Sequence, residues 1–256
     1  MRYKITLSYD GAAFCGWQIQ PGSPSVQETL QDALSTLLAE RISVTGAGRT
    51  DTGVNAVGYA AHFDCSRSGF DARDICYKLN AILPSGVVVH EIVPVTDDFH
   101  ARFGARRREY AYFIHRGKDI FLDRKSYRCP YPLDLGAMRE AASRIVGKRD
   151  FSCFEKTGGN NKTSVCDVFS CTVETYIPGH AETLGYPYRD GDYIVIRIAA
   201  DRFLRNMVRA VAGTLVEIGR GRRPVEWIDQ VLASGDRCSA GESVPGYGLY
   251  LYKVEY

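Results

Sequence analysis

The sequence predicts an α+β fold of two domains, each with helices packed on a mainly antiparallel sheet. Segments in which apolar and polar residues alternate with period two, typical of half-buried strands, are interspersed with amphipathic segments of helical period. The same plan of strands and helices then occurs a second time after about residue 105. With 256 residues and 45% apolar content, the chain can bury a sizeable core as one large or two small domains.

The first predicted domain, residues 1–104, starts with a strand, because apolar residues alternate with polar ones over residues 3–9. Ser25 and Glu28 form a capping box, which predicts a helix through Leu38. The later predicted elements are a strand over 59–63, a helix capped by Asp71 that ends before 84–86, and a strand over 87–93.

The second predicted domain, residues 105–256, repeats this plan. Its predicted elements are a strand over 109–115, a helix capped by Asp134, strands over 165–177 and 193–199, a helix over 203–218, a helix started by Pro224 and a strand over 249–256. Segments 160–162 and 185–191 are expected to form exposed loops.

The positive residues are concentrated in four places, although the formal net charge of +2 is too small to indicate a nucleic-acid partner. The arginine fork binds phosphate oxygens bidentately and stacks on bases, so arginine clusters beside tyrosines favour an RNA ligand. Any one cluster is equally typical of a solvated surface. The clusters are Arg102 with 106–108, Arg124 with Lys125 and Arg128, Arg202 with Arg205 and Arg209, and Arg220 with Arg222 and Arg223.

The cysteines and the apolar runs exclude other classes of protein. The eight cysteines are scattered without a Cys-x-x-Cys pair or clustered histidines, so we expect free thiols and no metal site. No run approaches the roughly 18 apolar residues of a membrane span, and the N-terminal residues lack the apolar region of a signal peptide. We therefore expect a cytoplasmic protein that does not contact a membrane.

A glycine-rich segment over residues 46–56 is the candidate site of chemistry. Its glycines allow a substrate to approach the main chain closely, and Asp51 is its only carboxylate. Neither a Gly-Lys-Ser/Thr ending nor a third glycine at the spacing of a dinucleotide fingerprint follows, which excludes the familiar phosphate loops. A plain turn, with Asp51 capping the backbone and Arg49 solvated, fits the residues as well.

The segment 48–54 resembles the Gly-Arg-Thr-Asp-x-Gly-Val core of the tRNA pseudouridine synthase A family. Thr52 and Asn55 depart from the usual alanine and histidine, which affects substrate positioning rather than the reaction. Five further blocks resemble family blocks in the same order, over residues 79–84, 99–103, 107–112, 203–209 and 248–251.

This resemblance implies the pseudouridine synthase fold, with the two domains joined around a central active-site cleft. It implies an enzyme that isomerises uridine to pseudouridine at positions 38, 39 and 40 in the anticodon arm of tRNA, with Asp51 as the catalytic carboxylate. The reaction needs no cofactor, because nothing is oxidised and no phosphate is transferred. The family is dimeric, so we expect a homodimer whose subunits both form the tRNA surface.

The resemblance also implies roles for three other residues. Tyr110 packs on the target base, although Tyr110 and Tyr112 are also typical of ordinary strand aromatics. Arg209 pairs with Asp51, because an ionised carboxylate away from water needs a partner. Leu249 forms an apolar wall beside the base. Independently of the resemblance, we expect Arg49 to contact a flanking phosphate and help extrude the nucleotide, and we expect a phosphate contact for Arg205 too.

The spacing of Arg202, Arg205 and Arg209 predicts one basic stripe on a helix, for which a plain surface stripe is the alternative.

Two other functions fit parts of the sequence. A non-catalytic RNA-binding module also combines helices, antiparallel sheets and exposed aromatic residues, and it would bind RNA without turnover. A hydrolase of small substrates would use Asp51, but the sequence offers neither a metal cluster nor a Ser/His pair to assist it.

Overall fold

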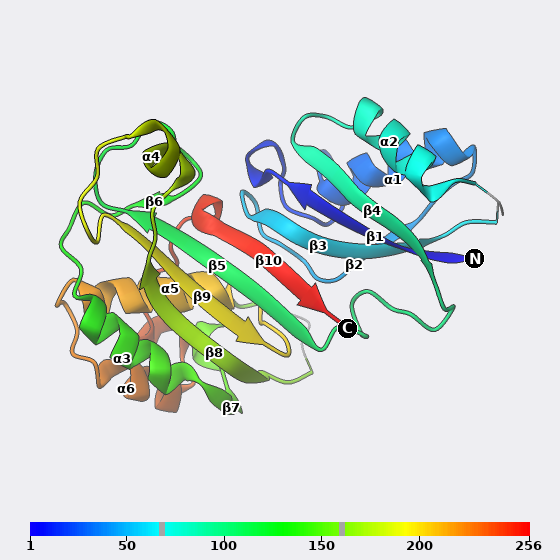
Figure 1. Ribbon diagram of the computed structural model, residues 1–256. Helices are drawn as coiled ribbons and strands as arrows, with labels where there is room; N and C mark the ends of the chain where they lie inside the picture. Colours follow the sequence, from blue (N-terminus) through cyan, green and yellow to red (C-terminus); the bar gives the residue numbers. More distant parts are fainter. Residues whose placement is uncertain (67–69, 159–161) are drawn as a thin grey trace. The chain divides into compact units, whose positions relative to one another are not determined.

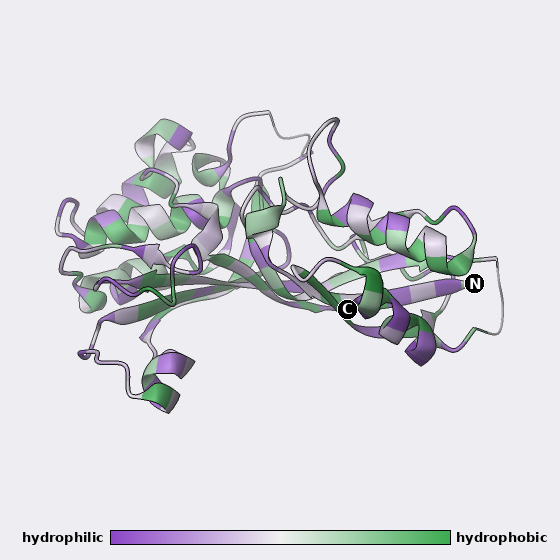
Figure 2. Ribbon diagram, turned by 90° about the horizontal axis from the view of Figure 1, so that it is seen from above, coloured by the Kyte–Doolittle hydropathy of each residue, from purple (hydrophilic) through white to green (hydrophobic). Residues whose placement is uncertain are grey.

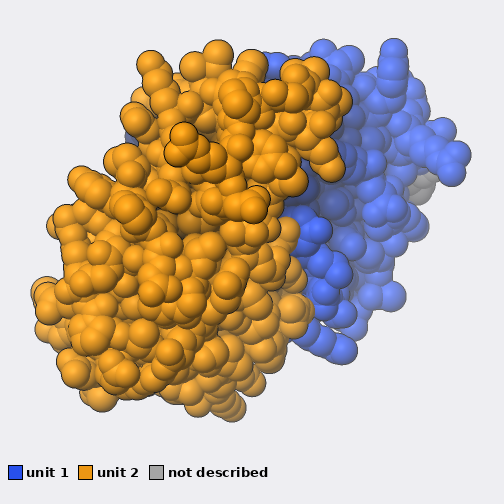
Figure 3. All heavy atoms as spheres, turned by 60° about the vertical axis from the view of Figure 1, so that its left-hand side comes forward, with its two compact units in different colours: residues 1–106, 250–256 blue, residues 107–249 orange. Residues whose placement is uncertain are grey.

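The computed structural model describes residues 1–66, 70–158 and 162–256 (Figure 1). It has an α+β fold whose strands pair mainly antiparallel, which confirms this part of the predicted fold class. The described residues divide into two compact units, coloured separately in Figure 3. Unit 1 comprises residues 1–106 and 250–256, and unit 2 comprises residues 107–249.

The sheet of unit 1 is built around its first strand, which pairs antiparallel on both sides. Its strands are β1 (Arg2–Tyr9), β2 (Val44–Gly46), β3 (Asn55–Asp64), β4 (Val87–Val95) and β10 (Leu249–Glu255). β1 lies between β3 and β4, and β2 adds to β3. β10 pairs parallel to β3, with Tyr250 opposite Asn55 and Leu251 opposite Ala56. The sheet is therefore mixed.

The helices of unit 1 begin at the predicted caps. α1 (Val26–Leu38) starts where the Ser25 hydroxyl accepts a hydrogen bond from the Glu28 amide, and α2 (Ala72–Ile82) starts at Asp71. α1 contacts both α2 and β2, and α2 packs along β4. Both helices bury one apolar face and leave the other polar, and hydrophilic and hydrophobic residues are interleaved along them (Figure 2).

Unit 2 repeats the combination of a sheet with helices. Its antiparallel strands follow the order β5 (Arg107–His115), β9 (Tyr193–Ala200), β8 (Val165–Thr175) and β7 (Gly147–Asp150), with β6 (Tyr127–Arg128) parallel to β5. Its helices are α3 (Leu135–Ile145), α4 (Gly179–Leu184), α5 (Met207–Gly219) and α6 (Trp227–Ser234). The Asp134 side chain caps α3 as predicted. α3 packs on both β8 and α5, which places the core of unit 2 between them.

The predicted helix over residues 203–218 is wrong at its start. Helix α5 begins only at Met207, because Asn206 has the left-handed conformation with φ of 66° and interrupts helical geometry. The Arg205 carbonyl instead accepts a hydrogen bond from the Lys156 amide at 3.0 Å. Arg202 and Arg205 therefore do not lie on the helix with Arg209, and the predicted basic stripe does not exist.

The other differences concern short elements, the C-terminal strand and the last helix, which begins at Trp227 rather than at the predicted Pro224. β2, β6, β7 and α4 are too short for their periodicity to be seen in the sequence. Residues 250–256 belong to unit 1 through the pairing of β10 with β3, whereas the sequence analysis placed them with the second domain. The boundary between residues 104 and 105 stays a prediction.

Two of the residues expected in an exposed loop, Asn160 and Asn161, lie outside the described residues, while Lys162 is exposed. Within the described ranges, every helix is too short or too polar to cross a membrane.

Candidate active site

The candidate catalytic loop, residues 47–54, connects β2 to β3 in unit 1. Thr50 is buried, and its hydroxyl hydrogen-bonds the Tyr9 hydroxyl at 2.8 Å. The Thr50 carbonyl accepts a hydrogen bond from the Trp17 amide at 3.2 Å. The half-buried Asp51 follows directly, and its carbonyl accepts a hydrogen bond from the Val54 amide at 3.1 Å. The backbone on both sides of Asp51 is thus held in place.

Three buried aromatic residues, Tyr9, Trp17 and Tyr59, form a cage under this loop. Trp17 stacks on Tyr59 with ring centroids 4.1 Å apart, and Tyr9 lies 5.5 Å from Tyr59. The Tyr59 hydroxyl donates a hydrogen bond to the Gly48 carbonyl. Sequence reasoning missed this cage, because its members come from three segments that are separate in sequence.

Two glycines of the glycine-rich segment, Gly46 at the end of β2 and Gly48 in the loop, have different roles. A methyl group on Gly46 would overlap the Tyr59 hydroxyl and lie 2.6 Å from the Trp17 ring, so close packing on the cage requires glycine there. A methyl group on Gly48 would meet no described atom within 4 Å beyond its chain neighbours. The main chain at Gly48 is therefore open to a ligand, as the sequence analysis expected for this segment.

Asn55 fixes the end of the loop. It is buried, and its side-chain oxygen accepts a hydrogen bond from the Gly11 amide at 2.9 Å. This contact ties the start of β3 to the turn after β1. Thr52 is exposed.

In unit 2, Arg209 is oriented by the segment that packs against α5. Its Nε donates a hydrogen bond to the Val244 carbonyl at 2.8 Å, and the Val244 amide donates to the Arg209 carbonyl at 3.3 Å. This approach requires Gly213, because a methyl group there would overlap the Glu242 carbonyl. Eleven of the 13 residues of α5 are buried, and Arg209 and Glu217 are the other two. The guanidinium is thus one of the few polar groups that this helix presents.

Tyr110 and Tyr112 lie two residues apart on β5 and so share one face of the strand. Tyr112 is fully buried, its hydroxyl donates to the Pro245 carbonyl at 3.0 Å, and burial raises its pKa well above the usual value. The Tyr110 ring meets Phe203 edge to face at 5.1 Å. Tyr112 therefore has a structural role, whereas Phe203 orients Tyr110.

The remaining predicted residues differ in their surroundings. Leu249 is buried at the start of β10. Arg205 is exposed, and its Nη1 lies 3.4 Å from the Thr157 carbonyl. Arg49 is exposed, and its side chain forms no hydrogen bond or ion pair with the described residues.

The six predicted residues divide between the two units. Unit 1 carries Arg49 and Asp51, and unit 2 carries the other four: Tyr110, Arg205, Arg209 and Leu249. The pairing of Asp51 with Arg209 therefore stays a prediction.

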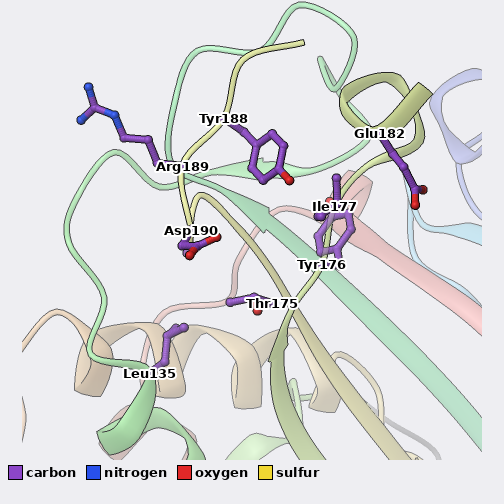
Figure 4. Close-up of a pocket in the computed structure, with 9 residues that line it drawn as sticks. Leu135, Thr175, Tyr176, Ile177, Glu182, Tyr188, Arg189 and Asp190 are labelled. Carbon is purple, nitrogen blue, oxygen red and sulfur yellow. The ribbon is translucent and has the colours of Figure 1, made fainter. Parts of the chain in front are cut away.

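A surface hollow of about 760 Å³ in unit 2 is not the candidate site. It is lined by residues 175–177 and 188–191 with Leu135 and Glu182, and none of the six predicted residues lines it. Figure 4 shows that Arg189 points away from Tyr176 and Tyr188. The hollow is therefore a separate feature of the surface of unit 2.

The model of the tRNA pseudouridine synthase family matches residues 5–104 and 141–256 of this chain. The chain belongs to this family of isomerases. Of the six predicted residues, only Tyr110 lies between the matched segments, which contain the other five: Arg49, Asp51, Arg205, Arg209 and Leu249.

The chain is also similar over its whole length to curated relatives named tRNA pseudouridine synthase A. The relative from Parabacteroides distasonis is 42% identical over 255 residues, which cover 100% of this chain and 96% of the relative. The relative from Bacillus licheniformis is 40% identical over 262 residues, which cover 100% of this chain and 99% of the relative. The family match and these relatives therefore show an isomerase of the tRNA pseudouridine synthase family.

Proposed function

We propose that this enzyme isomerises the uridines at positions 38, 39 and 40 in the anticodon arm of tRNA, with Asp51 as the catalytic carboxylate. The observation that carries this proposal is the loop of Asp51. Its backbone is fixed on both sides of the carboxylate, the aromatic cage supports it, and Gly48 leaves the main chain open to a nucleotide. A fixed catalytic group loses little entropy when the substrate binds.

The reaction detaches uracil from C1′ of the ribose, turns it and rejoins it through C5, so all atoms and electrons are retained. No oxidant, phosphate donor or other cofactor takes part. Asp51 adds to the sugar, adds to the ring or removes a ribose proton, and each route needs one carboxylate within bonding distance of the nucleoside.

Arg209 is the partner of the Asp51 carboxylate in this proposal. An ionised carboxylate shielded from water needs a charged, hydrogen-bonded partner to stay ionised. The hydrogen bond from its Nε to the Val244 carbonyl supports this role, because it fixes the plane of the guanidinium before substrate binds.

The other predicted residues hold the nucleotide. The target base must leave its stack, which costs a few kcal/mol. Tyr110 stacks on the extruded base and Leu249 forms an apolar wall beside it, while Arg49 and Arg205 contact flanking phosphates. The exposure of both arginines supports the phosphate contacts.

The test is Asp51→Asn, incubated with unmodified tRNA and followed by mapping of pseudouridine. The amide keeps the shape but loses the basic, nucleophilic oxygen, so turnover should fall below detection while tRNA affinity stays within about twofold. Asp32→Asn, an exposed carboxylate on α1, is the matched control and should react normally. Substantial turnover by Asp51→Asn would refute the catalytic assignment, and pseudouridine at other positions would refute the substrate assignment.

We also propose that the enzyme is a homodimer whose subunits together bind tRNA. Large apolar side chains are exposed on the part of unit 2 around α4, at Ile120, Phe121, Ile177, Leu184 and Tyr188. The Phe121 ring lies 5.1 Å from the His180 ring, which places Phe121 beside α4.

The mass measured by light scattering tests the dimer. Leu184→Glu places a charge in the patch and should shift the mass from two chains to one. Tyr77→Glu is the control, because Tyr77 is a similarly exposed apolar side chain of unit 1, and this variant should keep the mass of two chains. A wild-type mass of one chain would contradict the proposal.

A further inference from the structure

The turn over residues 99–104 presents an aromatic ring to solvent. Phe103 is 76% exposed, although the turn around it is well ordered by hydrogen bonds. The His100 Nδ1 accepts hydrogen bonds from the amides of Arg102 and Phe103, at 3.1 and 3.2 Å. The Gly104 amide donates to the His100 carbonyl at 2.8 Å. This turn lies in a block that the sequence analysis singled out and to which the proposed chemistry gives no role.

The base of the turn is fixed by three other parts of unit 1. The buried His62 of β3 accepts a hydrogen bond from the Ala101 amide at 3.1 Å. The Tyr256 hydroxyl donates to the Ala101 carbonyl, and Arg2 of β1 donates to the Phe99 carbonyl, each at 2.9 Å. The turn is therefore a rigid feature rather than a loose loop.

Aromatic and charged groups flank the Phe103 ring. The His100 ring lies 4.5 Å from the Phe103 ring on one side and 4.9 Å from the His62 ring on the other. The Arg102 guanidinium lies 5.4 Å from the centre of the Phe103 ring, and Arg106 is exposed three residues further on. A single exposed apolar residue is ordinary. An exposed aromatic ring on a hydrogen-bonded turn, with the exposed Arg102 guanidinium beside it, has the chemistry that stacks an unpaired base and binds its phosphate.

We propose that Phe103 is a stacking platform for an unpaired base of the bound tRNA, and that Arg102 binds the phosphate next to that base. A preformed platform suits RNA because an aromatic face stacks on any base, and the rigid turn loses little entropy on binding. This inference rests on tRNA being the substrate. It concerns affinity, whereas the proposal for Asp51 concerns the chemical step.

The experiment compares the dissociation constant for unmodified tRNA, at one salt concentration, between the wild type and the variants Phe103→Ala, Phe103→Tyr and Phe103→Leu. Removal of one stacked base should weaken binding by about tenfold in Phe103→Ala. Phe103→Tyr should bind as the wild type does, and Phe103→Leu should bind as weakly as Phe103→Ala, because leucine is apolar but does not stack. Thermal unfolding of each variant should match the wild type, since the ring is exposed.

Tyr77→Ala is the matched control, because Tyr77 is also an aromatic residue of unit 1 that is 76% exposed, and it should bind normally. Arg102→Gln should lower the dependence of binding on salt concentration, whereas Phe103→Ala should leave that dependence unchanged. Normal binding by Phe103→Ala, or rescue by leucine as complete as by tyrosine, would overturn the platform.

The rate at saturating enzyme separates this result from the proposed function. The platform predicts that Phe103→Ala reacts at the wild-type rate once tRNA is saturated. A slower rate at saturation would move Phe103 from tRNA binding to the chemical step and overturn the platform. If the wild type formed no pseudouridine at all, the proposed chemistry would be refuted, but the comparison of dissociation constants would still test the platform.

Discussion

Gly213→Ala tests how the fold positions Arg209. Two effects oppose each other in this variant. Alanine is the better helix former by about 1 kcal/mol, which favours the variant inside α5. The added methyl group, however, would overlap the Glu242 carbonyl and lie 3.0 Å from its carbon. These atoms belong to the backbone and have to retreat by roughly 1.5 Å to reach ordinary contact.

The steric effect should win. Overpacking of this kind costs about 1–3 kcal/mol. The movement also weakens the hydrogen bonds between Arg209 and Val244, and the bond of 2.9 Å from the Gly241 amide to the Thr214 hydroxyl. After the gain in helix propensity is subtracted, we expect a net loss of about 2 kcal/mol and a melting temperature about 4–8 °C lower. Displacement of the guanidinium by about 1 Å should slow turnover about 100-fold.

Denaturant unfolding and single-turnover pseudouridine formation at saturating enzyme measure both effects. Gly179→Ala is the control, because it makes the same change at the first residue of α4, where the methyl group meets no described atom within 4 Å. That variant should be as stable as the wild type, or slightly more stable, and fully active. If Gly213→Ala were equally stable and active, the segment 241–244 would not be what positions Arg209.

Three further predictions concern the loop, the proposed ion pair and pH. Tyr59→Phe removes the hydroxyl that donates to the Gly48 carbonyl, so the free energy of unfolding should fall by about 1–3 kcal/mol and the single-turnover rate should fall as well. An unchanged rate would show that the cage does not position Asp51. Arg209→Met should abolish turnover with little loss of tRNA affinity, whereas Arg205→Met should lose tRNA affinity and react normally at saturating enzyme. If both variants lost only affinity, the proposed pairing of Arg209 with Asp51 would be refuted. Burial lowers the pKa of His62, so as pH falls through about 6.5 the imidazole is protonated in the unfolded chain before it is protonated in the folded one. The free energy of unfolding should therefore decline from above that pH towards pH 5, and it should decline less steeply in His62→Gln.

Local features of the fold were predictable because their causes are local. Ser25, Asp71 and Asp134 cap their helices through side-chain bonds to amides two or three residues away, so the signal lies within a few positions of the sequence. The start of α5 was not predictable, because the apolar period continues through Asn206 while its backbone turns left-handed. Asn206 is held there by its side-chain bond to Ser243, which is distant in sequence.

The candidate site was predictable only in part. The glycines and the carboxylate of the loop are visible in the sequence, and so is the resemblance to a family. The cage of Tyr9, Trp17 and Tyr59 was not, because three separate segments contribute its rings. The reason for Gly46 was not visible either, since the close packing that requires glycine there exists only after those segments meet.

The parallel pairing of β10 with β3 has a consequence for how the protein is made. Residues 107–249, which form the whole of unit 2, leave the ribosome before residues 250–256. Until then β3 lacks the neighbour that pairs with Asn55 and Ala56, directly after the loop that carries Asp51. A polypeptide interrupted before residue 250 therefore lacks the strand that pairs with β3 next to the proposed catalytic loop.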